Sequence, residues 1–273
     1  MLRWCRVLLL SWLAFFPARA ALAAEADPML IVAHRGASNL APENTLASVK
    51  LAWKLGADGV ECDVFLSADG RVVVIHDPYT GRTAGEWRKV DQSSFSELRA
   101  LDVGRWKGAE FARERIPALE DLLETLPAGK HLLVEVKSGP EILDQLDSVL
   151  RRSGKRAQVV LMSFRLEVLA LAEMRWPELP TIWLKKAAKR YPSCERIAHD
   201  PSLIELARRN RVDGLGVEGA ALTGDFARAV KQAGMKLFVW TVDDPAAARE
   251  MRAWGADALI TNRPGWMRTQ LGL

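Results

Sequence analysis

The sequence predicts an α/β fold, a TIM (β/α)8 barrel with a small subdomain inserted between the second and third strands. Apolar runs of strand length recur eight times and alternate with helical patterns over about 240 residues. Most runs are continuous, as expected of strands that are buried on both faces. Strand counting does not prove closure, so a doubly wound open sheet is the alternative. The runs are LIVAH (30–34), GVECDV (59–64), HLLVEV (131–136), QVVLMS (158–163), PTIWLK (180–185), DGLGVE (213–218), KLFVWT (236–241) and DALIT (257–261).

The first 24 residues have the layout of a secretory signal peptide, which leaves one domain over 25–273. Arg3 and Arg6 precede an apolar segment over 7–16, and small residues follow it. That segment is too short for a spanning helix, although an uncleaved anchor is the alternative. We therefore expect an exported protein without a membrane span in the mature chain. It would be periplasmic in a Gram-negative host and secreted otherwise.

The charge of the mature chain gives no reason to expect a nucleic-acid partner. Of 38 basic residues, Arg3, Arg6 and Arg19 leave with the leader, so 35 remain against 34 acidic residues. The overall pI of about 9.0 therefore overstates the positive charge of the folded protein. Cys62 and Cys194 also remain, and two isolated buried thiols are favoured over a disulfide because Cys62 lies in an apolar strand pattern.

Helical patterns fill the intervals between the strands. Three of them end on Gly, a residue that commonly terminates helices. The clearest patterns are ENTLASVKLAWKLG (43–56), RLEVLALAEM (165–174), TGDFARAVKQAG (223–234) and PAAAREMRAWG (245–255).

One segment departs from the alternation. In ECDVFLSADGRVVVIHDP, two strand patterns are joined by SADG, which is too short for a parallel crossover but suits a hairpin. Residues 71–76 should therefore run antiparallel to the second strand, and a four-residue loop would place His76 beside Glu61. The polar stretch that follows, about 79–115, is expected to cover one end of the barrel.

Charged and aromatic side chains stand where the predicted strands end. In parallel barrels the active site lies at the carboxyl ends of the strands, so these residues should converge. They are His34, Arg35, Glu61, Asp63, Glu135, Lys137, Lys185, Glu218 and Trp240, with His76 arriving through the hairpin.

The acidic residues among them suggest a cation site. Glu61 and Asp63 are two residues apart, so both side chains lie on one face of a strand. Two such carboxylates repel each other unless a cation lies between them, and Glu135 would complete the site. Oxygen ligands favour Mg²⁺ or Ca²⁺ over Zn²⁺. The alternative is a carboxylate pair that is neutralised by Arg35 and Lys137.

The histidines suggest acid–base chemistry. His34 and His76 lie near three acids and two cations, which predicts an acid–base pair whose individual roles the sequence leaves open. His131 begins its strand at the far end, and His199 lies in a helix–loop region, so neither is placed in the site. The neighbouring cations suit a phosphoryl group, whose charge grows during displacement. Together these residues predict metal-assisted cleavage of a phosphate ester.

Several motifs together resemble the glycerophosphodiester phosphodiesterase family. They are HRGASNLAPENTLAS, GVECDVFLSADGRVVVIHDP, RIPALEDLLE, LLVEVK and VWTVDDPAAAREMRAWGADALITNRP, in the family's order and across nearly all of the mature chain. The resemblance implies a TIM barrel with an insertion at about 77–117. It also implies hydrolysis of small glycerophosphodiesters, such as glycerophosphocholine and glycerophosphoethanolamine, to sn-glycerol 3-phosphate and an alcohol.

The resemblance further implies roles for individual residues. Glu43 and Asn44 in PENT match a supporting position, with a helix cap as the alternative for Asn44. Trp240 matches an aromatic residue on the glycerol side of the substrate, with a packed strand Trp as the alternative. The remaining assignments are His34 and His76 as the catalytic pair, Glu61, Asp63 and Glu135 as ligands of Mg²⁺ or Ca²⁺, and Arg35 and Lys137 as phosphate-binding residues.

Two other functions remain open at the level of sequence. A lysophospholipase D or sphingomyelinase D-like enzyme on the same barrel would need an apolar groove, which Trp87, Trp106 and Phe111 would line unless they pack the inserted subdomain, as we expect. A non-catalytic phosphodiester-binding protein is the other alternative. Lys185 and Glu218 are candidates for contacts with the head group, whose identity the sequence does not give.

Overall fold

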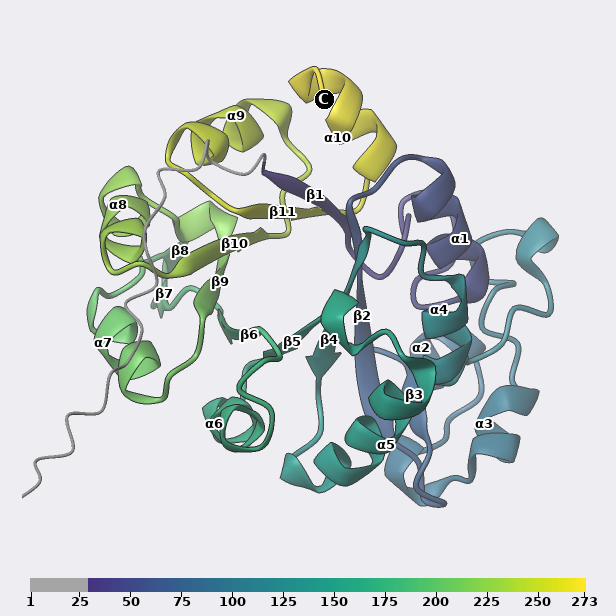
Figure 1. Ribbon diagram of the computed structural model, residues 1–273. Helices are drawn as coiled ribbons and strands as arrows, with labels where there is room; N and C mark the ends of the chain where they lie inside the picture. The colour runs from purple at the N-terminus through teal and green to yellow at the C-terminus, as the bar shows by residue number, and fades with distance from the viewer. Residues whose placement is uncertain (1–28) are drawn as a thin grey trace, which may run out of the picture.

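The computed structural model describes residues 29–273 and shows a closed parallel barrel (Figure 1). Its eight strands are β1 (Leu30–Ala33), β2 (Gly59–Leu66), β4 (His131–Val136), β5 (Val159–Ser163), β6 (Thr181–Lys185), β9 (Gly214–Glu218), β10 (Lys236–Trp240) and β11 (Ala258–Thr261). The parallel pairing of β1 with β2, in which Val32 lies opposite Gly59, closes the ring. The predicted barrel is therefore confirmed, and the open sheet is wrong.

The predicted leader, residues 1–24, lies outside the described residues. Within 29–273, no helix has the length and apolar character needed to cross a membrane.

Helices cover the outside of the barrel (Figure 1). Each buries an apolar face; in the helix over 143–153, for example, Leu143, Leu146 and Leu150 are all buried. The first helix begins at Leu46, because Thr45 is its N-cap and accepts a hydrogen bond from the Ser48 N–H at 3.3 Å. The helices are α1 (Leu46–Lys54), α4 (Leu119–Thr125), α5 (Leu143–Ser153), α6 (Leu166–Arg175), α7 (Ser202–Arg209), α8 (Gly224–Gln232), α9 (Pro245–Ala253) and α10 (Pro264–Leu271).

The barrel interior is filled by alternate residues of the strands. A Cβ on Gly214 or Gly216 of β9 would lie 2.7 Å or less from side-chain atoms of Ile182 or Leu184, so glycine is needed where the larger β6 side chains reach across. The same alternation, continued to the carboxyl ends, directs polar residues into the mouth of the barrel. The buried interior residues are Val32, Leu133, Met162, Ile182, Leu184, Phe238, Ala258 and Ile260.

The predicted hairpin is present, with a different register. Strand β3 (Val72–Val74) is antiparallel to β2, and Val74 lies opposite Val64. The Ser67 N–H bonds to the carbonyl of Arg71 at 2.9 Å, so the turn holds three residues and ends on Gly70 at φ +77°. This register places position 76 opposite position 62, so the expected pairing of His76 with Glu61 is wrong by one residue.

The segment predicted as an insertion contains α2 (Gly81–Ala84), α3 (Phe95–Ala100) and two short 3-10 turns. Together with β3 it encloses its own apolar cluster beside the barrel. Trp87 and Trp106 were expected to pack there, which is wrong, because they are 72% and 47% exposed. The cluster consists of Val73, Ile75, Val90, Leu98, Leu101, Val103 and Ile116.

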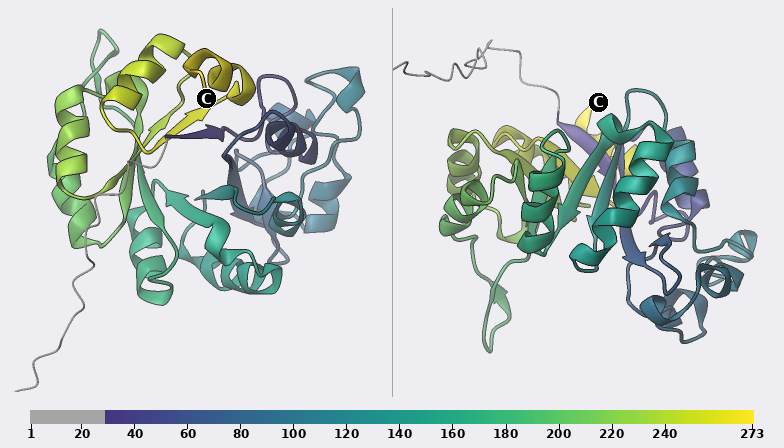
Figure 2. Two further views of the ribbon diagram at one scale, coloured as in Figure 1. Left: turned by 45° about the horizontal axis from the view of Figure 1, so that its top comes forward. Right: turned by 60° about the horizontal axis from the view of Figure 1, so that its bottom comes forward.

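A second hairpin follows β6 and projects from the carboxyl-terminal end of the barrel (Figure 2, right). It is formed by β7 (Lys189–Arg190) and β8 (Glu195–Arg196), which are antiparallel. Cys194 lies on this hairpin and is exposed, whereas Cys62 is buried in β2. Both thiols are free, as predicted, but the expected burial of Cys194 is wrong.

Three aspartates join neighbouring strands at the opposite end of the barrel. Asp58, Asp213 and Asp257 each precede a strand. Their carboxylates accept the backbone N–H of a neighbouring strand, from Ile31 at 3.1 Å, Thr181 at 2.8 Å and Leu237 at 2.7 Å respectively. Each aspartate also pairs its backbone N–H with the carbonyl of that same residue, which closes a small ring. The sequence analysis did not anticipate these contacts.

We predict that Asp58→Ala lowers the free energy of unfolding by about 2–3 kcal/mol, because it removes charge-assisted hydrogen bonds. Besides Ile31, Asp58 contacts Lys130 at 3.1 Å and Arg268 at 2.5 Å. Chemical denaturation would measure the change. As a control, Asp225→Ala at a 91% exposed side chain should change stability by less than about 0.5 kcal/mol. Equal effects of the two substitutions would contradict the role of Asp58.

Candidate active site

A cavity of about 230 Å³ lies at the mouth of the barrel and gathers most of the predicted site residues. Its walls come from β1, β2, β4, β5, β6, β10, β11 and the segment after β3, so residues distant in sequence meet here as the barrel geometry predicts. The lining residues are His34, Arg35, Glu61, His76, Glu135, Lys137, Met162, Phe164, Leu184, Lys186, Trp240, Thr241 and Ile260.

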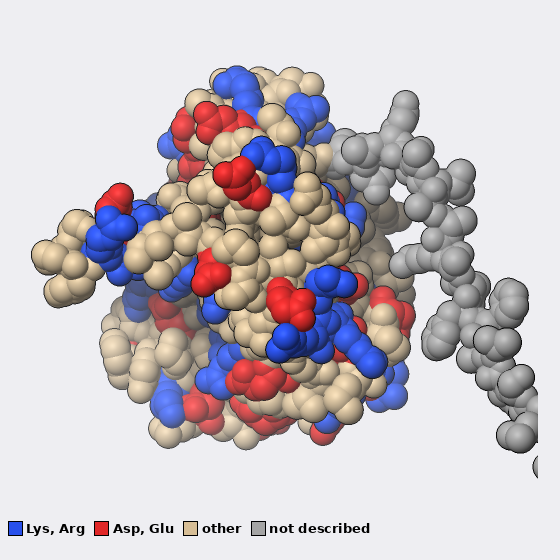
Figure 3. All heavy atoms as spheres, turned by 90° about the vertical axis from the view of Figure 1, so that its left-hand side faces the viewer, with Lys and Arg blue, Asp and Glu red and all other residues tan. Residues whose placement is uncertain are grey.

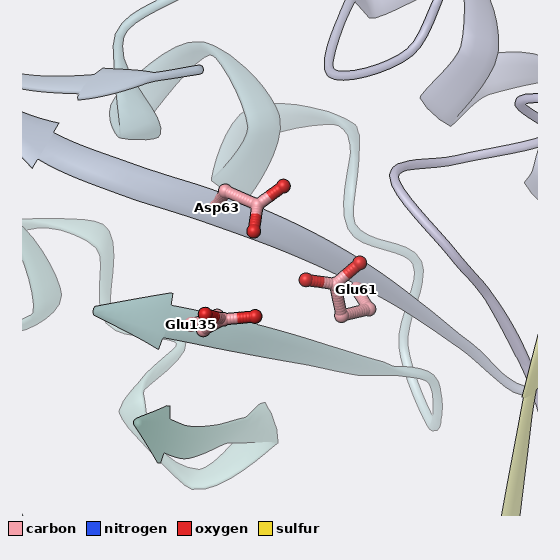
Figure 4. Close-up of side chains that lie close together, drawn as sticks. All are labelled: Glu61, Asp63 and Glu135. Carbon is pink, nitrogen blue, oxygen red and sulfur yellow. The ribbon is translucent and has the colours of Figure 1, made fainter. Parts of the chain in front are cut away.

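Three carboxylates form a buried cluster, and two of them, Glu61 and Glu135, line this cavity. Glu61 and Asp63 come from β2 and Glu135 from β4, directly opposite Asp63. One oxygen of each lies within 4.8 Å of the others, and Figure 4 shows the side chains grouped on two neighbouring strands. Glu61 Oε1 and Asp63 Oδ1 are buried without a hydrogen-bond partner. Hard oxygen donors with free lone pairs in this arrangement fit a divalent cation such as Mg²⁺ or Ca²⁺.

The ionisation of the cluster reflects its burial and mutual repulsion. Burial, followed by the charges of Asp63 and Glu135, raises the pKa of Glu61 well above its usual range. Burial and Asp63 likewise raise the pKa of Glu135 to about 7. For Asp63, burial is outweighed by the charges of Lys137 and Arg35, which hold the pKa of that carboxyl at about 2. The protein's own cations therefore neutralise one carboxylate well and leave the other two unfavourably placed without a further cation.

Ion pairs reach two of the three carboxylates. Lys137 Nζ lies 2.6 Å from Glu135 Oε1 and 3.2 Å from Asp63 Oδ1, and Arg35 Nε lies 3.2 Å from Asp63 Oδ2. The predicted alternative, neutralisation by Arg35 and Lys137, thus describes Asp63 and Glu135. It does not account for the unpaired oxygen of Glu61.

The loop after β1 holds its residues in an unusual backbone conformation. Arg35 and Gly36 have φ of +55° and +82°, and a Cβ on Gly36 would lie 2.4 Å from Ser48 Oγ, so only glycine fits. This turn lets the Arg35 N–H donate to Glu61 Oε2 at 2.9 Å. Glu43 receives Arg35 Nη1 at 2.8 Å and so fixes the guanidinium.

Asn44 supports the carboxylate cluster directly. Its Nδ2 donates to Asp63 Oδ2 at 2.8 Å, and its Oδ1 accepts the Asp63 N–H at 3.3 Å. The alternative role as a helix cap is wrong, because Thr45 occupies that position.

His34 is oriented by two residues to which the sequence analysis gave no role. Its Nδ1 lies 2.8 Å from Asn262 Oδ1, and Asn262 Nδ2 donates to Asp243 Oδ2 at 2.6 Å. Since the carboxylate fixes the amide, Asn262 presents its oxygen, and His34 Nδ1 carries the hydrogen. His34 Nε2 is then left without a proton in the neutral ring. The signal for this support was the VDD and TNRP segments at the ends of β10 and β11.

His76 is held by a carboxylate instead of an amide. Its Nδ1 lies 2.6 Å from Asp77 Oδ1, and Asp77 Oδ2 receives Arg82 Nε at 2.5 Å. Arg82 also donates to both oxygens of Glu43 at 2.7 and 2.9 Å, so it links the supports of His76 and Arg35. Nothing in the sequence singled out Arg82, because its partners lie 5 and 39 residues away.

Two predicted residues are not brought to the cavity. Lys185 Nζ lies 4.6 Å from the centre of the Trp183 ring, and Glu218 pairs with Arg196 at 2.6 Å. Lys186 lines the cavity instead, and the sequence analysis missed it. It lies two residues after Leu184, so its side chain points to the same side, into the barrel. His131 and His199 are also absent from the lining of this cavity, as expected.

Trp240 lies at the rim in a fixed position. Its Nε1 donates to the carbonyl of Gly216 at 2.9 Å, and its ring packs edge-to-face on Phe164 at 5.5 Å. It is therefore both a packed strand residue and part of the cavity wall.

A closed barrel with histidines, cations and carboxylates at the carboxyl ends of its strands has the layout of a TIM-barrel enzyme. Residues 34–266 match the Glycerophosphoryl diester phosphodiesterase family, and the chain belongs to this family. The resemblance drawn from the sequence is thus confirmed, and with it the prediction of a phosphoric diester hydrolase.

Individual relatives agree with the family assignment. A glycerophosphodiester phosphodiesterase of Caldanaerobacter subterraneus subsp. tengcongensis is 33% identical over 240 residues, covering 86% of this chain and 94% of the relative. A phosphodiesterase of Oleispira antarctica, solved with the product sn-glycerol-3-phosphate, has a TM-score of 0.80 at 29% identity, covering 89% of this chain and 97% of that one. The enzyme of Agrobacterium tumefaciens gives 0.73 at 29% identity, with 88% and 99% covered.

We predict that Arg82→Met lowers kcat about 10- to 100-fold with a smaller change in KM, because supports of this kind position the groups they hold. Steady-state kinetics with a small glycerophosphodiester would measure this, and thermal unfolding would show an unchanged midpoint. The control is Arg71→Met, which removes a surface pair with Glu120 and should leave kcat unchanged. A normal kcat in Arg82→Met would contradict the positioning role.

Proposed function

We propose that the protein hydrolyses small glycerophosphodiesters to sn-glycerol 3-phosphate and an alcohol in a metal-dependent reaction. The observation that carries the proposal is the buried carboxylate cluster, in which Glu61 Oε1 has no partner among the described residues, beside a cavity lined by His34 and His76. The product-bound relative from Oleispira antarctica supports the same product. We further propose that the reaction takes place after export, in view of the leader-like sequence at the N-terminus.

The proposed roles follow from charge. Glu61, Asp63 and Glu135 would hold Mg²⁺ or Ca²⁺, and a bound cation would draw electron density from the phosphoryl oxygens. Arg35 and Lys137 line the same cavity and supply the positive charge that orients the phosphate.

The two histidines differ in a way that suggests separate tasks. His34 faces an amide oxygen and keeps Nε2 unprotonated, which suits a base that takes the proton of the glycerol 2-hydroxyl. The hydroxyl oxygen then bonds to phosphorus as the bond to the head-group oxygen breaks. We assign the acid role to His76, which would give its proton to the departing alcohol. Burial lowers the pKa of His76, and Asp77, 2.6 Å from Nδ1, acts in the opposite direction without reversing the shift. Water opens the resulting cyclic phosphate with the two roles reversed.

An apolar groove for a lipid substrate finds no support among the described residues. The cavity lining includes no residue of 77–117, so Trp87, Trp106 and Phe111 are not part of the cavity wall. Trp240 forms the aromatic wall on which the glycerol moiety would pack.

We expect the purified protein to release sn-glycerol 3-phosphate from small glycerophosphodiesters, to stop in EDTA and to recover with Mg²⁺ or Ca²⁺. His34→Ala and His76→Ala should each lower kcat by at least about 100-fold, whereas the control His131→Gln, at the opposite end of the barrel, should not. Release of choline from a lysophospholipid instead would favour a phospholipase D. Tight binding without turnover would favour a binding protein.

We predict that kcat/KM falls at low pH as His34 becomes protonated, and that the apparent pKa of this fall lies below 6.5, the ordinary value for histidine. Burial and the charge of Arg35 lower the pKa of His34. Asn262, Asp63 and Glu43 act in the opposite direction without reversing it. Because the base must be neutral, its lowered pKa keeps the enzyme active below pH 6.5.

Asn262→Asp replaces the neutral partner of His34 by a carboxylate, which stabilises the imidazolium. The acid limb of the pH profile should therefore move upward by about one pH unit. An unmoved limb in this variant would contradict the assignment of His34 as the base.

A further inference from the structure

One wall of the cavity carries a cation and an aromatic ring. Lys186 follows β6, and its Nζ lies 5.7 Å from the centre of the Phe164 ring. Lys137 Nζ lies 5.9 Å from the centre of the same ring. Two protein cations therefore already occupy the surroundings of Phe164. An aromatic ring that recognises a quaternary ammonium ligand must instead be free to receive it.

Leaving aside the carboxylates assigned to a metal ion and the two histidines, all charged residues that line the cavity are basic. They are Arg35, Lys137 and Lys186. The loop that carries Lys186 leads into the projecting hairpin, which also carries basic residues. Its Arg190 pairs with Glu195 at 3.3 Å, while Lys189 makes no ion pair with any residue in 29–273. Figure 3 shows this hairpin as the arm at the left, with basic side chains along it and uncharged residues at its tip.

The size of the cavity keeps the head group close to these cations. At about 230 Å³ it is smaller than the roughly 300–1,000 Å³ of pockets for drug-sized ligands. With the phosphate between Arg35 and Lys137 and the glycerol moiety on Trp240, the head group of a diester would extend along the wall formed by Phe164 and Lys186. A positive charge on the head group would meet Lys186 at short range, where like charges repel most.

We propose that the enzyme prefers glycerophosphodiesters with an uncharged polyol or anionic head group over those with a cationic amine, and that Lys186 determines this preference. The inference rests on the proposed function. It departs from the substrates that the family resemblance implies, because glycerophosphocholine and glycerophosphoethanolamine both carry a cationic head group.

The test compares kcat/KM for glycerophosphoglycerol and glycerophosphocholine, two substrates that share the glycerol and the phosphate. The wild type should favour glycerophosphoglycerol by about tenfold or more, the factor that corresponds to 1.4 kcal/mol of discrimination. Lys186→Glu should reduce or reverse that ratio, chiefly by improving kcat/KM for the choline substrate. Lys186→Met, which removes the charge and keeps most of the stem, should lie between the two.

Lys189→Glu is the matched control, because it makes the same charge change in the same loop outside the cavity lining. Its ratio should equal that of the wild type. A wild-type preference for glycerophosphocholine would overturn the proposal, as would a Lys186→Glu variant that loses activity equally toward both substrates. Equal shifts in both glutamate variants would also overturn it, since they would indicate long-range steering instead of contact with the head group. Failure to release sn-glycerol 3-phosphate from either substrate would contradict the proposed function itself.

Discussion

The burial of three carboxylates side by side is the constraint to which the rest of the site responds. Glu61, Asp63 and Glu135 sit on adjacent strands, where their mutual repulsion is not screened by water. Arg35 and Lys137 form ion pairs with Asp63, whereas one oxygen of Glu61 has no partner among the described residues. A structure that depends only on its own charges would gain from pairing that oxygen. Together with the two carboxylates beside it, this oxygen belongs to a cluster that could bind a cation.

The supports around the cluster alternate in sign. Arg35 is held by Glu43, Glu43 by Arg82, and Arg82 by Asp77, which in turn holds His76. Each charge has an opposite neighbour, so the array is neutralised link by link and each long side chain is fixed at two points. Arg82 comes from the segment that interrupts the regular barrel. That segment therefore contributes to the site through His76 and Arg35 without lining the cavity.

Strand geometry explains how much of this was predictable. Apolar runs and the i, i+2 spacing placed the barrel strands, the carboxylates and His34 correctly, because both signals are local. The register of His76 was missed because Ser67 joins the ladder and shortens the turn, which depends on the φ of Gly70. Lys185 is the last residue of β6, but the side chains that point into the cavity alternate along the chain and include Leu184 and Lys186, so the end of the strand does not by itself identify the lining lysine.

The two ends of the barrel use acidic residues in opposite ways. At the amino-terminal end, Asp58, Asp213 and Asp257 each accept a backbone N–H of a neighbouring strand, and Asp58 and Asp257 also pair with lysines or arginines, so they stabilise the ring of strands. At the carboxyl-terminal end, Glu61 and Glu135 destabilise the protein by themselves, since burial and repulsion raise the pKa of each. Hydrogen bonds at the amino-terminal end thus help to keep the barrel closed. The carboxyl-terminal end can then carry buried carboxylates that are available to a ligand. A cation that satisfies those carboxylates would also stabilise the fold, so binding and folding are linked through the same three side chains.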